Sequence, residues 1–213
     1  MRVVVFGGRG TIGSRVTAEL VRRGHTVRVV DRAGSTARPL IPGTAGVAAE
    51  VANPSSVAEA VRGADAVVSA IGPAEGQEPT VILSAARALI SGLKRAGVPR
   101  LVVIGGAGSL EVRPGVRLVD TADFPTAWKP IAEAHGAALA IYRAETDLEW
   151  TVVSPAANLA PGTRTGHYRA GADQLLTDGK GESHISAEDL AVAVVDELET
   201  PRHVRRRFSV VSA

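Results

Sequence analysis

Seven residues near the start of the chain, Gly7-Gly8-Arg9-Gly10-Thr11-Ile12-Gly13, most restrict what it can fold into. They follow an apolar, β-branched run over residues 2–6, which predicts a strand buried on both faces. Behind them, apolar residues recur at helical spacing until Gly24 supplies a stop. A second apolar run over residues 26–30 ends at Asp31-Arg32. This order of strand, glycine turn, helix and strand is typical of half of a dinucleotide-binding site.

The glycines of this turn have separate physical roles. Gly7 and Gly10 let the backbone turn sharply and approach a pyrophosphate that a side chain would push away. Gly13 lets the helix pack closely against the strands. The backbone amides at the helix start, at Thr11 and Ile12, are then free to hold phosphate oxygens at the positive end of the helix dipole. A glycine turn without a ligand is the alternative.

Composition limits the function classes. The chain has 213 residues, 45% of them hydrophobic, which is typical of one domain spanning residues 1–213. The formal charge is only +2, and we interpret the one arginine-rich stretch, residues 202–207, as a solvated basic tail, so no nucleic-acid partner is expected. With no cysteine and five scattered histidines, no disulfide and no metal site is expected.

The start of the chain and the length of its apolar runs bear on location. Residue 1 enters the first strand directly, and no apolar run reaches membrane-spanning length. We therefore expect a soluble, cytoplasmic protein without a membrane partner, either a monomer or a homodimer.

Strands and helices alternate along the rest of the chain. Apolar runs predict strands at 47–51, 64–71, 100–104, 150–153 and 208–211, and a small hairpin after residue 169. Helices are predicted to open at residues 53–56 and to cover 79–96, 128–147 and 186–198, with a loop over 108–125. The fold class is therefore α/β: a Rossmann-type, doubly wound, mostly parallel sheet with helices on both faces. A small C-terminal substrate-side region completes it, with substrate-side elements mainly at 107–130 and 154–185.

Small residues gather where the predicted strands end. In an open α/β sheet, ligands bind outside the carboxyl ends of the strands. The ends that leave room for an extended cofactor are Ala70-Ile71-Gly72, Gly105-Gly106 and Ser154-Pro155-Ala156-Ala157. Each tight turn alone would also favour glycine, so the inference depends on their recurrence.

These segments resemble those of the atypical short-chain dehydrogenase/reductase proteins with an NAD(P)H-binding domain, close to the NmrA-like and flavin/biliverdin-reductase-like members. The resemblance rests on residues 3–13, 65–72, 105–110 and 154–156 and extends to the closing segment at 185–191. It implies that the pyrophosphate is lined by Gly7, Gly10 and Gly13, and that the adenine lies beside Glu50 and Val51. It also implies that the ribose lies along Ala70, Ile71 and Gly72, and that the nicotinamide lies near Ser154, Pro155, Ala156 and Ala157.

Two neighbouring residues disagree about the cofactor. Asp31 can accept hydrogen bonds from an adenosine 2′-hydroxyl, which favours NAD. Arg32, with Arg9 inside the glycine turn, can clamp a 2′-phosphate, which favours NADP. Two guanidinium groups against one carboxylate favour NADPH, with NAD as the alternative.

The proton donor is harder to predict. The superfamily's Tyr-x-x-x-Lys pair is absent, since Tyr142 is followed by Thr146, and we interpret Tyr142 as a packing residue. Three other candidates remain, and each has a structural alternative. Ser109 is either a substrate-facing hydroxyl or a simple loop serine, and Lys129 is either a partner of an anionic substrate or a surface lysine. His135 is either a proton donor or a residue that packs the helix. A segment with Arg164, His167 and Tyr168 is either a substrate lid or a connecting loop.

Two functions follow from these expectations. The first is an NADPH-dependent reductase that transfers hydride to a small conjugated acceptor such as a flavin, quinone or carbonyl compound. The second is an NmrA-type redox sensor that binds the dinucleotide without turnover. Epimerase or dehydratase chemistry on a nucleotide sugar is weaker, because the chain is short for a substrate domain and the Tyr/Lys pair is missing.

Overall fold

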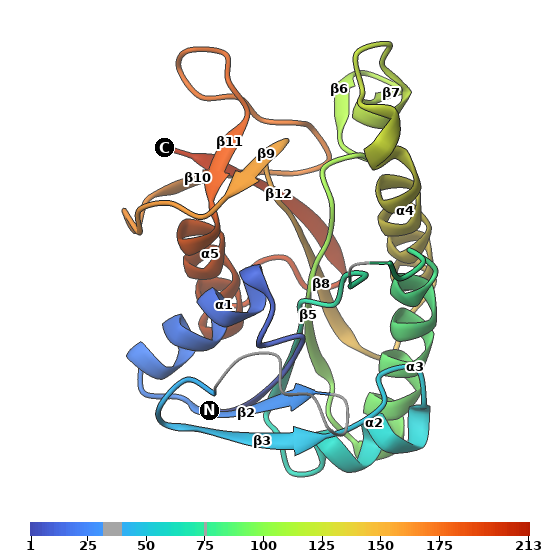
Figure 1. Cartoon of the computed structure of the whole chain (residues 1–213), viewed down its shortest axis with the longest axis vertical. Coiled ribbons are helices and arrows are strands. Elements are labelled where there is room, and N and C mark those ends of the chain that lie inside the picture. The colour runs from blue at the N-terminus through green and yellow to red at the C-terminus, as the bar shows by residue number, and fades with distance from the viewer. Residues whose placement is uncertain (32–39, 75) are drawn as a thin grey trace.

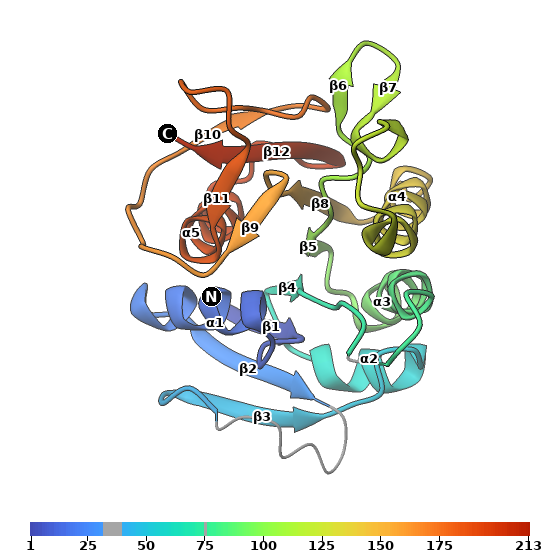
Figure 2. The ribbon, with the colours of Figure 1, turned by 45° about the horizontal axis from the view of Figure 1, so that its top comes forward.

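A computed structural model describes residues 1–31, 40–74 and 76–213. Its centre is an eight-stranded sheet in the order β10-β12-β8-β5-β4-β1-β2-β3 (Figure 2). The strands are β1 (Arg2–Phe6), β2 (Thr26–Asp31), β3 (Thr44–Ala48), β4 (Ala66–Ser69), β5 (Arg100–Ile104), β8 (Glu149–Ser154), β10 (Tyr168–Gly171) and β12 (Arg206–Ser212). Seven of them are parallel, and β10 pairs antiparallel with β12.

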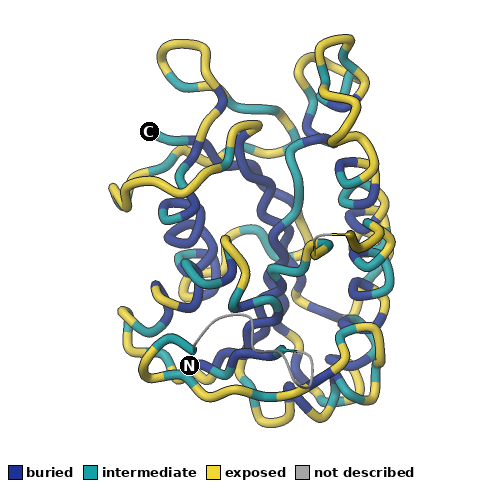
Figure 3. Tube along the Cα trace, in the orientation of Figure 1, coloured by how far each residue is buried: buried dark blue, intermediate teal, exposed yellow. Residues whose placement is uncertain are grey.

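Helices cover both faces of this sheet (Figure 1). They are α1 (Thr11–Arg22), α2 (Pro54–Val61), α3 (Val81–Ala96), α4 (Lys129–Arg143) and α5 (Ala187–Glu199). Along β1, Val3 and Val5 pack with α1 and α5, whereas Val4 and Phe6 pack with α2, α3 and α4. Successive side chains of a strand point to opposite faces, so one apolar run fills two cores. Figure 3 shows the result as a buried central sheet under exposed connections. The predicted Rossmann-type fold is confirmed.

The order of the strands creates a crevice at β1. From β1 the chain adds β2 and β3 on one side, then returns to add β4, β5, β8 and β12 on the other. Because these strands are parallel, their carboxyl ends lie at one edge of the sheet, which we call the carboxyl edge. The chain changes direction across the sheet between β1 and β4, and this switch point is where open α/β sheets bind ligands.

Three connections differ from the predictions. Strand β3 ends at Ala48, not at residue 51. The last hydrogen bond between β3 and β2 is donated by the Ala49 amide to the carbonyl oxygen of Asp31, and the Glu50 amide donates to the Ser56 hydroxyl instead. The hairpin expected after residue 169 is wrong, since β10 pairs with β12 and β11 (His184–Ser186) pairs with β9 (Asn158–Ala160). The loop over 108–125 contains a short hairpin of β6 (Glu111–Arg113) and β7 (Val116–Arg117) and a 3-10 turn, Leu118–Asp120.

The arginine-rich stretch at 202–207 is not a solvated tail, which corrects the sequence interpretation. Its last two residues begin β12, and the side chain of Arg207 is only 3% exposed. The Arg207 guanidinium donates to Asp173 at 2.7 Å and to the Ser109 hydroxyl at 2.8 Å. A carboxylate and a hydroxyl from distant segments therefore allow this charge to be buried.

Candidate functional site

The glycine turn after β1 is packed so tightly that side chains are excluded. Gly7 has φ +72°, and a Cβ there would lie 2.6 Å from the carbonyl oxygen of Ala70, which follows β4. A Cβ on Gly13 would lie 2.1 Å from the carbonyl oxygen of Gly7. The Gly10 amide donates to that same oxygen at 3.0 Å and closes the turn. The turn thus brings the backbone after β1 into close contact with the backbone after β4, and the glycines make this close approach possible, as the sequence predicts for Gly7 and Gly13.

Helix α1 begins at this turn without protection from its own side chains. Gly10 is its N-cap residue, its first turn holds no acidic residue, and no side chain of the described residues accepts a hydrogen bond from its first amides. A Cβ on Gly10 would meet only the Gly7 carbonyl within 4 Å. Amides at the start of a helix need an acceptor, and an anion is the best one. The residues present therefore fit a diphosphate, as expected for a dinucleotide.

An ion pair joins the turn to the end of β2. Arg9 Nε lies 3.1 Å from Asp31 Oδ2, and both side chains are mostly buried. The two residues that disagreed about the cofactor are thus in contact, and the guanidinium offsets the carboxylate charge. Beside them lies a cavity of about 80 Å³ whose wall includes Arg9, Ser14 and Leu40. Arg32, the second predicted guanidinium, lies outside the described residues.

The other predicted cofactor segments lie along the carboxyl edge. Glu50 and Val51 follow β3 in the turn that leads to α2. Ala70, Ile71 and Gly72 follow β4, and a Cβ on Gly72 would meet nothing within 4 Å. Gly105 and Gly106 follow β5. Ser154 ends β8, and Ser154, Pro155 and Ala156 are buried whereas Ala157 is exposed. Their contacts with a cofactor stay predictions.

His135 lies beneath this edge, on the face of α4 turned to the sheet. A Cβ on Gly106 would lie 3.2 Å from the imidazole ring. The ring lines a small cavity together with Ile71 and Gly105, two of the predicted cofactor residues. Burial lowers the pKa of His135 to about 4, so the imidazole is neutral at pH 7. Of the three predicted catalytic residues, His135 lies beside the predicted cofactor residues.

Ser109 and Lys129 are not in that cavity. The Ser109 hydroxyl accepts a hydrogen bond from Arg207 and lines a separate cleft of about 460 Å³ on the other side of α4. Lys129 is exposed at the first residue of α4. Since α4 leads into the parallel strand β8, its first residue lies toward the carboxyl edge.

The segment with Arg164, His167 and Tyr168, a lid candidate from the sequence, is bonded to helices α1 and α5. Arg164 donates two hydrogen bonds to Glu19 on α1, at 2.9 and 3.0 Å. The Tyr168 hydroxyl donates to Asp196 on α5 at 2.9 Å. Both contacts lie on the seam between α1 and α5, so the connecting-loop interpretation is supported for these two residues.

Comparison with known proteins agrees with this geometry. The NAD(P)H-binding family matches residues 7–201. The chain belongs to that family. The match confirms the resemblance drawn from the sequence, because the matched region contains the glycine turn and every strand end on the carboxyl edge up to β8.

Three solved structures are similar over nearly the whole chain. A "Putative exported protein" from Burkholderia pseudomallei is 45% identical with TM-score 0.90, and 99% of each chain is covered. A "putative epimerase" from Bacteroides thetaiotaomicron is 38% identical with TM-score 0.88, covering 99% of this chain and 96% of that one. SP1627, "a putative NADH-flavin reductase" from Streptococcus pneumoniae, is 30% identical with TM-score 0.85, and 100% of each chain is covered.

Among the described residues, no helix combines the length and apolar character needed to cross a membrane.

Arg207 and Asp173 are the polar site residues that sequence reasoning missed. Asp173 accepts from Arg207 at 2.7 Å and from Arg143 at 2.9 Å, on the wall of the cleft that also holds Ser109. Burial lowers the pKa of Arg207, against the opposing effect of Asp173. The mostly apolar residues 208–211 predict a final strand, but they do not predict that the strand starts two residues earlier.

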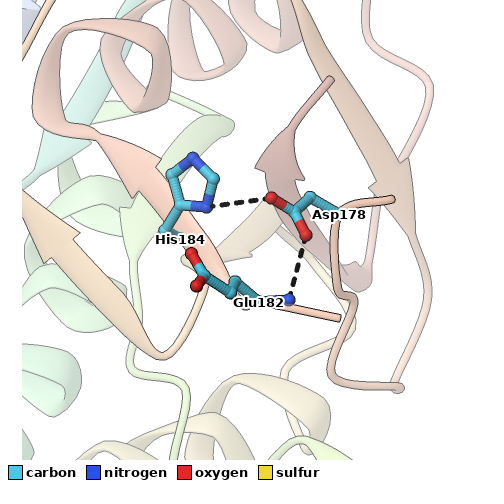
Figure 4. Close-up of side chains that lie close together, drawn as sticks. All are labelled: Asp178, Glu182 and His184. Carbon is cyan, nitrogen blue, oxygen red and sulfur yellow. Dashed lines mark hydrogen bonds and ion pairs between the residues drawn. The ribbon is translucent and has the colours of Figure 1, made fainter. Parts of the chain in front are cut away.

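Another group of polar side chains comes from the loop between β10 and β11 and from His184, the first residue of β11 (Figure 4). Asp178 Oδ1 accepts hydrogen bonds from the amides of Lys180 and Glu182, at 2.8 and 2.9 Å. Its other carboxylate oxygen lies 3.5 Å from Nδ1 of His184, and Glu182 lies beside them. Because Asp178 already satisfies two amides of its own turn, these contacts account for the shape of the loop.

Proposed function

We propose that this protein is an NADPH-dependent reductase of the atypical short-chain dehydrogenase/reductase type. The observation that carries the proposal is the bare start of α1, at the switch point of the sheet, in a chain of the NAD(P)H-binding family. The amides of Thr11, Ile12 and Gly13 would hold the diphosphate, and the segments along the carboxyl edge would hold the remainder of the dinucleotide. When bound, the dinucleotide supplies a hydride.

The preference for NADPH is supported by the Arg9–Asp31 pair. An isolated carboxylate at the end of β2 would repel a 2′-phosphate, but Arg9 offsets that charge at 3.1 Å. A guanidinium presents five donors, so Arg9 can bind a phosphate and Asp31 together. Replacing Arg9 by Gln should raise the Kd for NADPH about tenfold and leave the Kd for NADH within about twofold. Equal losses for both nucleotides, measured by isothermal titration calorimetry, would contradict this preference.

The acceptor would lie where the carboxyl edge meets the segments 107–130 and 154–185. A small conjugated acceptor fits this proposal, and the name of SP1627 favours a flavin. His135 would face the acceptor, exposed Lys129 would attract an anionic one, and Ser109 would hold Arg207 in place. We expect the protein to act in the cytoplasm, although the Burkholderia relative is named as exported.

A dinucleotide sensor without turnover is the second candidate, because no Tyr-x-x-x-Lys pair is present in the sequence. The two functions are separated by following NADPH absorbance at 340 nm with flavins, quinones and carbonyl compounds. A reductase oxidises NADPH with at least one acceptor class, and the variant Gly10→Asp abolishes that activity. Tight NADPH binding with no oxidation across the panel would favour the sensor, and no binding would contradict both.

A further inference from the structure

Three polar side chains meet in one small cavity beneath the carboxyl edge. The cavity has a volume of about 20 Å³ and is lined by Ser69 at the end of β4, by His135 and Tyr142 of α4, and otherwise by apolar residues and Gly105. His135 and Tyr142 are seven residues apart, so they share one face of the helix. Helical side chains lean toward the helix N-terminus, which directs the Tyr142 hydroxyl toward His135.

The two hydroxyl groups are deeply buried. Ser69 is 3% exposed and Tyr142 is 2% exposed. Among the described residues, neither hydroxyl nor the His135 ring has a protein hydrogen-bond partner, and none of these atoms is among the fully enclosed unpartnered ones, so each borders the open space of the cavity. Leaving such groups unsatisfied costs about 1–3 kcal/mol each. A polar cavity of this volume accommodates one water molecule, which needs two to four such partners.

His135 stands between this cavity and the cofactor edge. Its ring packs against Gly106, and the cavity wall includes Ile71 and Gly105, which follow β4 and β5. One ring nitrogen can therefore face the interior hydroxyls while the other faces the edge. In a neutral imidazole only one nitrogen carries hydrogen, and the partner of the inner nitrogen decides which one.

We propose that Tyr142 and Ser69, through one water molecule, fix the tautomer of His135 so that its N–H points to the acceptor. The inner nitrogen accepts a hydrogen bond from this arrangement, and the outer N–H donates one to the acceptor oxygen or nitrogen. His135 then stabilises charge on the acceptor without giving up its proton. The acceptor gains two electrons and one hydrogen nucleus from the reduced dinucleotide, and its remaining proton comes from solvent. This role rests on the proposed reductase function.

The ionisation of both side chains agrees with this geometry. Burial lowers the pKa of His135 to about 4, which keeps it neutral and able to donate and accept together. Burial also raises the pKa of Tyr142 well above its ordinary value, so its hydroxyl stays a donor. Tyr142 and Ser69 are positioning residues, whereas His135 contacts the acceptor.

The test compares Tyr142→Phe with Tyr168→Phe, the same change at the chain's other tyrosine, whose hydroxyl bonds Asp196 on α5. The Tyr142→Phe ring retains its packing near Trp150, whose ring centroid is 6.3 Å away. Imidazole nitrogen shifts of ¹⁵N-histidine-labelled protein report the tautomer without any turnover, and loss of one signal in His135→Gln assigns it. Ser69→Ala provides a second variant.

We expect one dominant His135 tautomer in the wild type and in Tyr168→Phe, and a mixture in Tyr142→Phe. With a carbonyl acceptor, Tyr142→Phe should lower kcat about fivefold with unchanged KM for NADPH. An unchanged His135 tautomer in both Tyr142→Phe and Ser69→Ala would overturn the positioning role. If the wild type oxidises no NADPH, the reductase function fails instead, and the nitrogen shifts still decide whether the cavity sets the tautomer.

Discussion

Helices α1 and α5 pack side by side on one face of the sheet, yet they begin in opposite ways (Figure 1). Each leads into a strand of the parallel set, so both start at the carboxyl edge. At α5 the Ser186 hydroxyl accepts from the Asp189 amide at 2.9 Å, and both Glu188 and Asp189 lie in the first turn. At α1 the positions that correspond to Ser186, Glu188 and Asp189 hold Gly10, Ile12 and Gly13, and none of them is acidic.

The side chains of α5 also satisfy the loop before it. The Asp189 carboxylate accepts from the amides of Thr165 and Gly166, at 2.8 Å each, and Glu188 accepts from the amide of Gly162 at 2.7 Å. A helix start saturated by its own acids has a structural role, whereas one built from bare amides needs an external anion. The contrast supports the proposal that the dinucleotide binds at α1 and not at α5.

The largest expected effect comes from giving α1 the kind of start that α5 has. Gly10→Asp places a carboxylate at the N-cap, where the extended backbone of Gly10, φ −69° and ψ 172°, suits a capping residue. The carboxylate occupies the amides and repels the diphosphate, so the Kd for NADPH should rise at least about a hundredfold. The stability of the unliganded protein should change by less than about 1 kcal/mol, because the new cap is offset by a Cβ that lies 3.3 Å from the Gly7 carbonyl oxygen.

Gly10→Ala is the matched control, since it adds the same Cβ without a charge. It should lose much less affinity than Gly10→Asp in the same calorimetric titration. Equal losses would mean that shape, and not the freedom of the amides, explains binding at α1.

A second prediction concerns the seam that joins the two helices. Buried Glu19 of α1 accepts hydrogen bonds from Arg22, Arg23 and Arg164, and Arg23 continues to Asp196 and Glu199. Contacts with Arg22, then with Arg164 and Arg23, hold the pKa of Glu19 well below its ordinary value despite burial. Glu19→Gln should lower the free energy of unfolding by about 2 kcal/mol at pH 7, because buried charge pairs are costly to break.

The pH dependence has a definite sign. A lowered carboxyl pKa in the folded state adds stability above the ordinary value of about 4.3, and the gain is lost as pH falls below it. The difference between wild type and Glu19→Gln in urea unfolding should therefore shrink between about pH 5 and pH 3. A constant difference over that range would show that the carboxylate charge is not what joins the helices.

The smallest effect is expected from removing the cap of α5. Ser186→Ala deletes the hydroxyl that accepts from Asp189 and donates to the Thr163 carbonyl at 2.9 Å. The protein should lose about 1 kcal/mol of stability, and its Kd for NADPH should stay within about twofold of the wild type. A large loss of NADPH affinity in this variant would contradict a purely structural role for the start of α5.

The sequence was sufficient to predict α1 and its turn because their determinants are local. Glycine spacing, apolar periodicity and the Asp31 that ends β2 all lie within a short segment, and the structure has the same order of elements. The ion pair between Arg9 and Asp31 was not predicted, although it follows from the pairing of β1 with β2.

The features that sequence reasoning missed depend on distant partners. Arg207 is buried only because Asp173 and Ser109 come to it from other loops. Likewise, β10 finds its partner in β12, forty residues away in the chain, to which no local turn signal points. The sequence predicts only a packing role for Tyr142, because nothing local shows that its hydroxyl shares a cavity with Ser69 and His135.

The central claim is that the first amides of α1, and not those of α5, receive the diphosphate. A ¹H–¹⁵N correlation spectrum recorded during titration with NADPH tests it directly. We expect the largest chemical-shift changes on the amides of Thr11, Ile12 and Gly13, and almost none on the amides of residues 187–189. Saturable binding that leaves the α1 amides unchanged would contradict it.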